Sequence, residues 1–170
     1  MRRASTWLGA GAILILIVAS TAFATEIEMK DVPEAVMKAA HDRFPNIEIT
    51  EAAVEEDEDG KTIYEITLDD HNMNIDATFT PEGALTLMEK EISFKTLPKP
   101  VVKTMETDYP KVQYRMVEEV IEVSGKDEKL AHYEVLISDK DKKLHSIELS
   151  KEGKILKVED KGVEGEEEED

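Results

Sequence analysis

The sequence contains no cysteine, so the chain can form no disulfide, no thiolate nucleophile, no cysteine-ligated zinc site and no iron–sulfur cluster. Aromatic residues are scarce, at 5% of the chain, and acidic residues outnumber basic ones by 39 to 21. The resulting net charge of −18 repels nucleic acid and anionic lipid, and it attracts cations and basic partners. Without disulfides, the fold must be held together by core packing.

Motifs of hydrolytic and nucleotide-dependent enzymes are missing as well. The chain has no Gly-x-Ser-x-Gly, no His-Glu-x-x-His and no glycine-rich phosphate loop. Carboxylates are spread along the whole sequence, so none is marked out as a general acid or base. We therefore predict a protein that is not an enzyme and that uses no cofactor.

The one long apolar run lies at the N-terminus, where Arg2 and Arg3 precede Trp7–Val18. The next segment ends in Ala22-Phe23-Ala24, the small-x-small pattern that precedes signal-peptidase cleavage. An uncleaved membrane anchor is the alternative, but the apolar run is short for a spanning helix. The sequence predicts a signal peptide over residues 1–24, then a periplasmic or secreted protein with a charge of −20 and no membrane attachment.

The opposite end of the chain is strongly acidic. Residues 159–170 read "EDKGVEGEEEED" and offer almost nothing apolar to bury. Such a composition cannot offset the entropy of ordering the chain. We predict a disordered acidic tail over 161–170, which serves as a solubilising extension.

Two segments of the mature chain correspond to each other at a constant offset of 65 residues: "DVPEAVMKAAHDRFP" (31–45) and "TLPKPVVKTMETDYP" (96–110). Apolar residues recur at every fourth position, which places them along one side of a helix. We predict two helices with N-caps at Asp31 and Thr96, with Pro33 and Pro98 in the first turn. The matching apolar positions are Val36, Ala40 and Phe44 in the first segment and Val101, Met105 and Tyr109 in the second.

Strand-like runs follow each predicted helix. After the first helix they occupy 46–57, 61–70, 72–80 and 84–92, and after the second 111–123, 130–138, 143–150 and 154–160. Turn residues such as Asp59-Gly60 separate these runs, and the alternation of side chains within each run has the period of a strand. The sequence thus predicts an α+β fold of two tandem units, 25–92 and 93–160, each a helix with a four-stranded antiparallel sheet. Whether the two units share one continuous sheet is left open.

The alternation within the runs assigns their two faces. Tyr64, Ile66 and Leu68 share one face with the later counterpart Tyr133, and we expect that face to pack under a helix. The other face is polar and is expected to be exposed to solvent. Its residues are Glu65, Thr67, Asn72, Asn74, Asp76 and Thr78 in the first unit, and His132, Glu134, Leu136 and Ser146 in the second.

The doubled pattern resembles the PepSY-like family, also described as the putative β-lactamase-inhibitor-like family. The resemblance rests on "VPEAVMKAAHDRFP…YEITL…PEGAL" and "LPKPVVKTMETDYP…YEVLI…KEGKI", and it covers about 31–160. It implies an exported bacterial protein with a fold similar to that of the β-lactamase inhibitory protein, whose two repeats form one concave surface. The resemblance supplies no catalytic residues. The lack of cysteine and the scarcity of aromatic residues argue against β-lactamase inhibition itself.

Two metal sites can be considered from the residues. The acidic stretch "EEDEDGKTIYEI" (55–66) has the spacing of a calcium loop at its start, but Ile66 stands where the bidentate glutamate belongs, so a hairpin turn explains it better. His132 and His145 could be cross-strand neighbours that, with Glu134, hold zinc or nickel; two separate strand histidines are the commoner arrangement. No metal site is predicted.

These observations predict an exported binding module that engages a protein or peptide through the concave polar face. Inhibition or regulation of an exported enzyme is one form of this function, and the acidity favours a partner with a basic segment. The predicted partner-binding residues are Glu65, Thr67, Asn74, Asp76, His132 and Glu134. The alternative is an acidic cation-binding or metal-buffering periplasmic protein. The sequence does not indicate the oligomeric state.

Overall fold

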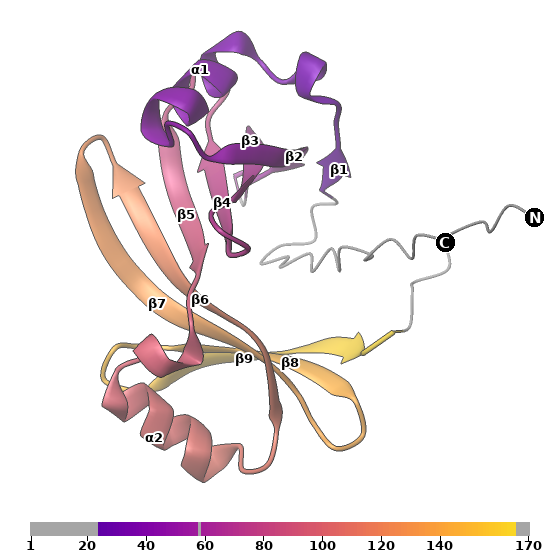
Figure 1. The fold of residues 1–170 in the computed structure, drawn as a ribbon, viewed down its shortest axis with the longest axis vertical. Helices are drawn as coiled ribbons and strands as arrows, with labels where there is room; N and C mark the ends of the chain where they lie inside the picture. Colours follow the sequence, from indigo (N-terminus) through magenta and orange to yellow (C-terminus); the bar gives the residue numbers. More distant parts are fainter. Residues whose placement is uncertain (1–23, 58, 166–170) are drawn as a thin grey trace, which may run out of the picture.

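The computed structural model describes residues 24–57 and 59–165 (Figure 1). Nine antiparallel strands form one sheet, in which each strand is hydrogen-bonded to the next one along the chain. The strands are β1 (Thr25–Glu26), β2 (Glu48–Glu56), β3 (Thr62–Asp69), β4 (Asn74–Phe79), β5 (Leu85–Glu91), β6 (Gln113–Ser124), β7 (Asp127–Ser138), β8 (Lys143–Leu149) and β9 (Ile155–Val163). Most of the predicted signal peptide (1–23) and the last residues of the predicted tail (166–170) lie outside the described residues. Strand β9 extends into the segment for which a disordered tail is predicted.

The predicted α+β fold of two tandem helix-plus-four-strand units is wrong. The described part of the chain is mostly β, with only two α-helices, each of ten residues, α1 (Glu34–Arg43) and α2 (Lys99–Asp108), and its strands belong to one sheet. The continuity comes from β5 and β6, which pair with each other and place Met88 opposite Ile121. Sequence periodicity predicts strands one at a time and does not show which strands pair.

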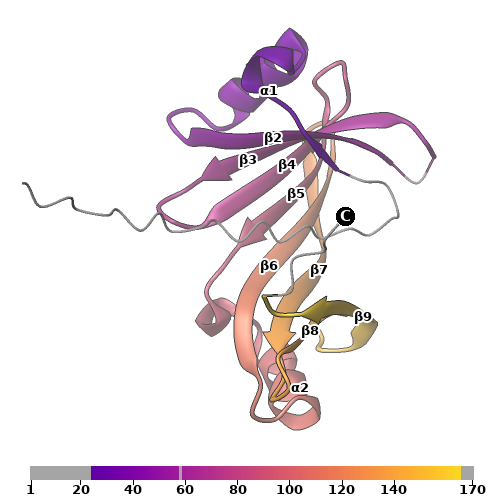
Figure 2. The same ribbon diagram turned by 90° about the vertical axis from the view of Figure 1, so that its right-hand side faces the viewer.

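The long hairpin of β6 and β7 joins the two parts of the molecule. Each of these strands has 12 residues, and in Figures 1 and 2 the hairpin runs from the region of α2 to the region of α1. Along β6, Val117 packs in the core under α2, whereas Ile121 and Val123 pack against the core under α1. At the far end, Arg43 forms an ion pair of 2.7 Å with Glu128. Strand β6 therefore contributes to both cores.

The helices begin later than predicted. Pro33 and Pro98 occupy the N-cap positions of α1 and α2, and no side chain caps either helix. Asp31 and Thr96, the predicted N-caps, instead end two short 3-10 helices, η1 (Met29–Asp31) and η2 (Phe94–Thr96). A proline resists helical geometry in the residue before it, so the chain makes a separate tight turn there before the helix begins.

The predicted buried positions of the two helices are confirmed. Val36, Ala40 and Phe44 pack with Ile66, Leu68, Ala77 and Phe79 in one core, and Val101 and Met105 pack with Val135, Ile137, Ile147 and Leu149 in the other. Tyr64 and Tyr133 lie on this helix-covered face, as the alternation predicts. Within the described residues, neither helix is long and apolar enough to cross a membrane.

Candidate functional site

The face of the sheet opposite the helices carries most of the predicted binding residues. Thr67 and Asp76 are directly opposite each other on β3 and β4, and the Thr67 hydroxyl donates a hydrogen bond of 2.6 Å to Asp76 Oδ1. Glu65 lies two residues from Thr67 on β3 and therefore on the same face. The structure thus brings three of the predicted residues together near the middle of the sheet.

The other three predicted residues lie elsewhere on this face. Asn74 is exposed at the start of β4, and its backbone N–H donates a 3.1 Å hydrogen bond to Glu91 Oε2. His132 has its Nε2 atom 3.9 Å from Glu148 Oε2. Glu134, on β7, is directly opposite both Glu118 on β6 and Glu148 on β8.

Two acidic residues absent from the prediction complete the arrangement. Glu89 on β5 is directly opposite Asp76, and Glu118 on β6 is directly opposite Glu134. One carboxylate therefore comes from each of five consecutive strands. We call this set, Glu65, Asp76, Glu89, Glu118 and Glu134, the carboxylate band. At about 4.8 Å per strand it crosses about 19 Å of sheet.

The sequence predicts that this face is exposed to solvent, but the centre of the face is buried. Glu118 is only 1% exposed and Glu134 only 5%, so the interpretation of Glu134 as a solvent-facing carboxylate is wrong. Val120, Leu136 and Ser146 are also buried on this face. The face is therefore a mixed surface, in which acidic side chains lie beside apolar ones.

The two most buried carboxylates differ in their hydrogen bonding. The Ser146 hydroxyl, on the neighbouring strand, donates a hydrogen bond to Glu134 Oε1. In the described part of the chain, Glu118 Oε2 has no hydrogen-bond partner. A buried carboxylate oxygen without a partner costs about 1–3 kcal/mol or more relative to a satisfied one.

Burial and the repulsion of neighbouring acids raise the pKa values of four members of the band. Desolvation is the larger cause for Glu65, whose pKa rises to about 8, with contributions from Asp76, Glu55 and Glu51. The pKa of Glu89 also rises to about 8, through desolvation and the charges of Glu134 and Glu65. Glu118 has the highest pKa, about 9, again chiefly from desolvation. Burial likewise raises the pKa of Asp76, although its hydrogen bond from Thr67 opposes this.

The missed residues have a physical explanation. In "MVEEVIEV", both alternating sets mix acids with apolar residues: Val117, Glu119 and Ile121 on one side, Glu118, Val120 and Glu122 on the other. Alternation therefore does not assign Glu118 to a face. Recognition of the band requires the pairing of β5 with β6, which the sequence leaves open.

Neither of the metal sites considered from the sequence is present among the described residues. His132 and His145 are not neighbours: His145 is opposite Ile137 on the core side of the sheet, whereas His132 is on the same face as Glu134. The Nε2 atom of His145 lies 3.7 Å from Asp139 Oδ2. The acidic stretch forms a hairpin turn, in which Asp57 Oδ1 accepts hydrogen bonds from the N–H groups of Asp59 and Lys61. In residues 24–57 and 59–165, no three His, Asp or Glu side chains are placed to hold a metal ion.

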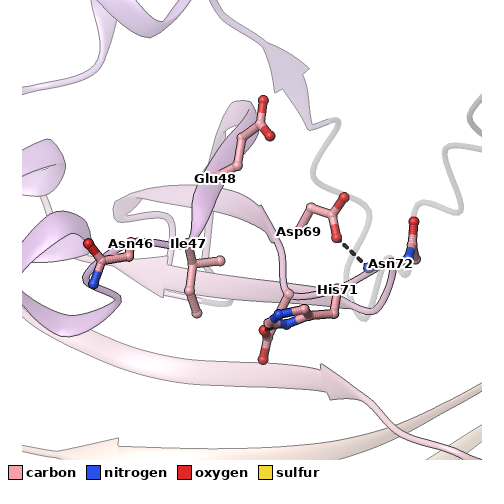
Figure 3. Close-up of a pocket in the computed structure, with 7 residues that line it drawn as sticks. Asn46, Ile47, Glu48, Asp69, His71 and Asn72 are labelled. Atoms are coloured by element: carbon pink, nitrogen blue, oxygen red, sulfur yellow. Dashed lines mark hydrogen bonds and ion pairs between the residues drawn. The ribbon is translucent and has the colours of Figure 1, made fainter.

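A depression of about 300 Å³ lies away from the carboxylate band, where the turn after α1 meets the turn between β3 and β4 (Figure 3). Its lining is polar, and the Asn72 N–H donates a 2.6 Å hydrogen bond to Asp69 Oδ1 within it. The His71 side chain is 93% exposed. The hydrogen bonds here are those of a solvent-exposed turn and indicate no ligand.

Known structures share this fold. A periplasmic protein of Bacteroides eggerthii superposes with a TM-score of 0.61 at 13% identity, over 76% of this chain and 88% of that one. A DUF2874 family protein of Bacteroides uniformis gives 0.59 at 14% identity, over 75% and 88%. A BLIP-like protein of Bacteroides fragilis gives 0.54 at 19% identity, over 76% and 87%. Identities this low show the fold alone.

Sequence comparison supplies the family. No curated protein matches the chain. A family model described as "Putative beta-lactamase-inhibitor-like, PepSY-like" matches residues 21–86 and residues 71–157, and these two overlapping segments span most of the chain. The match agrees with the resemblance seen in the Val-Pro and Leu-Pro helix starts and the Tyr-Glu strands. The chain belongs to the PepSY-like, β-lactamase-inhibitor-like family.

Proposed function

We propose that this protein is an exported, non-enzymatic binding module that engages a protein or peptide through the face bearing the carboxylate band. Inhibition or regulation of an exported enzyme is one form of this function. The partner presents a basic segment to the band, because the face and the chain as a whole are strongly acidic.

The observation that carries the proposal is the burial of carboxylates on the side of the sheet that lacks a helix. Val36 and Val101 lie in the two cores under the helices, so the fold has its apolar cores on the other face. Burial of like charges is costly and adds nothing to those cores. Carboxylates with strongly raised pKa values concentrate at functional sites. Glu65, Glu89 and Glu118 have this property, and they come from both parts of the sheet.

The relatives support the class of function and the location. The Bacteroides eggerthii protein is described as periplasmic and the Bacteroides fragilis protein as BLIP-like, and the description of the matching family names no enzyme. A periplasmic or secreted location agrees with the signal peptide predicted over residues 1–24. No observation on the described residues favours the alternative of a metal-buffering protein.

A capture experiment with a matched control tests the proposal. The bait is the mature chain from residue 25, and the source is an envelope extract of the native organism. The site variant carries Glu65→Gln, Asp76→Asn and Glu134→Gln. The control carries Glu34→Gln, Glu82→Gln and Glu152→Gln, three exposed positions away from the band, and it loses the same number of carboxyl groups.

We expect the wild type and the control to capture the same partner and the site variant to lose it. Loss from both variants would indicate nonspecific attraction to an acidic protein. Equal capture by all three proteins, or capture by none, would contradict binding through this face.

A further inference from the structure

One member of the carboxylate band, Glu118, is buried without a full set of hydrogen-bond partners. Its side chain is 1% exposed, and its Oε2 atom has no hydrogen-bond partner within the described residues. The charges that act on it are those of Glu89, Asp76, Glu134 and Glu91, and all of them are negative. In its ionised form, a buried carboxylate surrounded by other acceptors lacks a hydrogen-bond donor.

The surroundings of Glu118 favour an organic cation over a metal ion. The carboxylates come from separate strands, and in the described chain no three of them are arranged as ligands of one ion. An ammonium group has three N–H donors, so it can bond to several carboxylates that do not converge on a point. Val120 and Leu136, both buried on this face, provide apolar contacts for methylene groups attached to the ammonium.

We propose that Glu118, together with Glu89 and Glu134, forms a binding site for an ammonium group at the end of an aliphatic chain. The lysine side chain of a partner segment and a free alkylamine share this chemistry. The inference rests on the proposed function, because it assigns a specific group of the partner to the same face. It goes further in predicting that one amine, not acidity in general, determines recognition.

Binding at this site is coupled to proton release. Burial raises the pKa of Glu118 to about 9, so its carboxyl group holds a proton at neutral pH when the site is empty. An ammonium group favours the ionised carboxylate, so the proton leaves when the amine binds. The described charges that act on Glu118 are those of the acids named above. The cationic and titratable groups nearby on this face are His132 on β7, opposite Val120, and Lys157 and Lys161 on β9, which form ion pairs of 2.6 and 2.9 Å with Glu159. Lys157 also interacts electrostatically with Glu134.

Calorimetry with the mature chain tests the inference. The probes are the capped tripeptide Ala-Lys-Ala, its norleucine analogue, which lacks the ammonium group, the free amine n-butylamine, and calcium chloride. Titrations in phosphate and in Tris buffer, which differ in ionisation enthalpy, report the protons released. The variants are Glu118→Gln and Glu89→Gln, and the matched control is Glu122→Gln, an exposed glutamate four residues further along β6 on the same face.

We expect the lysine peptide to bind and the norleucine peptide not to bind. Affinity should rise up to tenfold per pH unit between pH 6 and pH 8, with heats that depend on the buffer. Glu118→Gln and Glu89→Gln should each weaken binding at least tenfold, and Glu122→Gln should not. Binding of n-butylamine as tightly as the peptide identifies a free amine as the natural ligand, whereas peptide binding alone identifies a partner's lysine.

Three results would overturn the inference: equal binding of the norleucine peptide, unchanged affinity in the folded Glu118→Gln protein, or binding of calcium alone. The capture experiment separates this failure from failure of the proposed function. A partner that is captured equally by the wild type and by Glu118→Gln, but lost by the triple site variant, leaves the binding face intact and removes only the ammonium site.

Discussion

Glu118 and Glu134 are directly opposite each other on β6 and β7, and both are almost completely buried. Like charges at such positions destabilise a sheet, and burial increases the cost of each charge. The raised pKa of Glu118, about 9, eases this conflict because the Glu118 carboxyl group keeps its proton at physiological pH. The fold therefore tolerates the pair by keeping a proton that an exposed glutamate loses.

The stability of the protein should fall as the pH rises. The folded-state pKa values of Glu65, Glu89 and Glu118 are about 8, 8 and 9, above the ordinary 4.5 of an unfolded glutamate. Between about pH 4.5 and pH 9, the native state thus binds more protons than the unfolded state. The contribution of these groups is fully present below pH 4.5 and is lost as the pH rises through 8 to 9.

Replacement of Glu118 isolates this effect. Glutamine resembles the protonated carboxyl group, so Glu118→Gln should melt close to the wild type at pH 5 and above it at pH 9. One pKa unit corresponds to about 1.4 kcal/mol, so a rise of about 3 °C or more is expected at pH 9. Thermal melts across this range provide the measurement, with Glu122→Gln as the control. A constant difference between Glu118→Gln and the wild type at every pH would contradict the prediction.

The faces of single strands could be predicted from the sequence, whereas the carboxylate band could not. Tyr64 and Glu65 alternate within a strand whose core face is apolar throughout, so periodicity places both on their correct sides. The band depends on which strands pair, and Asp76 meets Glu89 only through the register of β4 and β5. Pairing is a long-range property, and the burial of Glu134 depends on it as well.

The same reasoning explains the error in the fold class. The offset between 31–45 and 96–110 predicts two similar helices, and the structure contains both. That correspondence does not show that Ile121 and Val123, which follow the second helix in sequence, pack against the core under the first helix, α1. A hydrophobic residue in a strand is predicted to be buried, but its sequence does not identify the core that buries it.

Two glycines in matching turns should resist substitution. A Cβ at Gly83 would lie 2.5 Å from the backbone oxygen of Ala35, and one at Gly153 would lie 2.4 Å from that of Pro100. Both glycines also have positive φ, at 83° and 80°. Gly125 has a positive φ of 63° but nothing within 4 Å of an added Cβ. It therefore separates the cost of the backbone conformation from the cost of the close contact.

Alanine at each position should reveal the close contact with the helix. Gly125→Ala has only the cost of its backbone conformation, about 1 kcal/mol. Gly83→Ala and Gly153→Ala must also displace the first turn of a helix, so we expect each to cost at least about 2 kcal/mol more. Urea denaturation measures the difference. Equal losses at all three positions would mean that the turns do not pack tightly against the helices.

Lys111 should be a position where substitution stabilises the protein. It follows the second helix with φ of 68°, where the corresponding Asn46 has φ of 71°. Lysine in this left-handed conformation is strained, whereas asparagine and glycine adopt it more readily. Lys111→Asn should therefore increase the free energy of unfolding by about 0.5–1 kcal/mol. Lys126→Asn serves as the control. Lys126 is an exposed turn residue without a positive φ, so this substitution should change stability little. A loss of stability at Lys111→Asn would contradict the strain argument.

Met88 and Val158, which lie opposite Ala77 and Ile147 on their neighbouring strands, should differ sharply in their sensitivity to truncation. Met88 is completely buried, because the next strand places Ile121 opposite it and Val123 packs against the same core. Val158 lies on β9, the last strand of the sheet, and is 48% exposed. Met88→Ala should cost about 2–5 kcal/mol, and Val158→Ala less than about 1 kcal/mol. Urea denaturation of both variants gives the two costs. A large loss at Val158→Ala would show that a further surface covers β9 in solution, since removal of a half-exposed side chain creates no cavity.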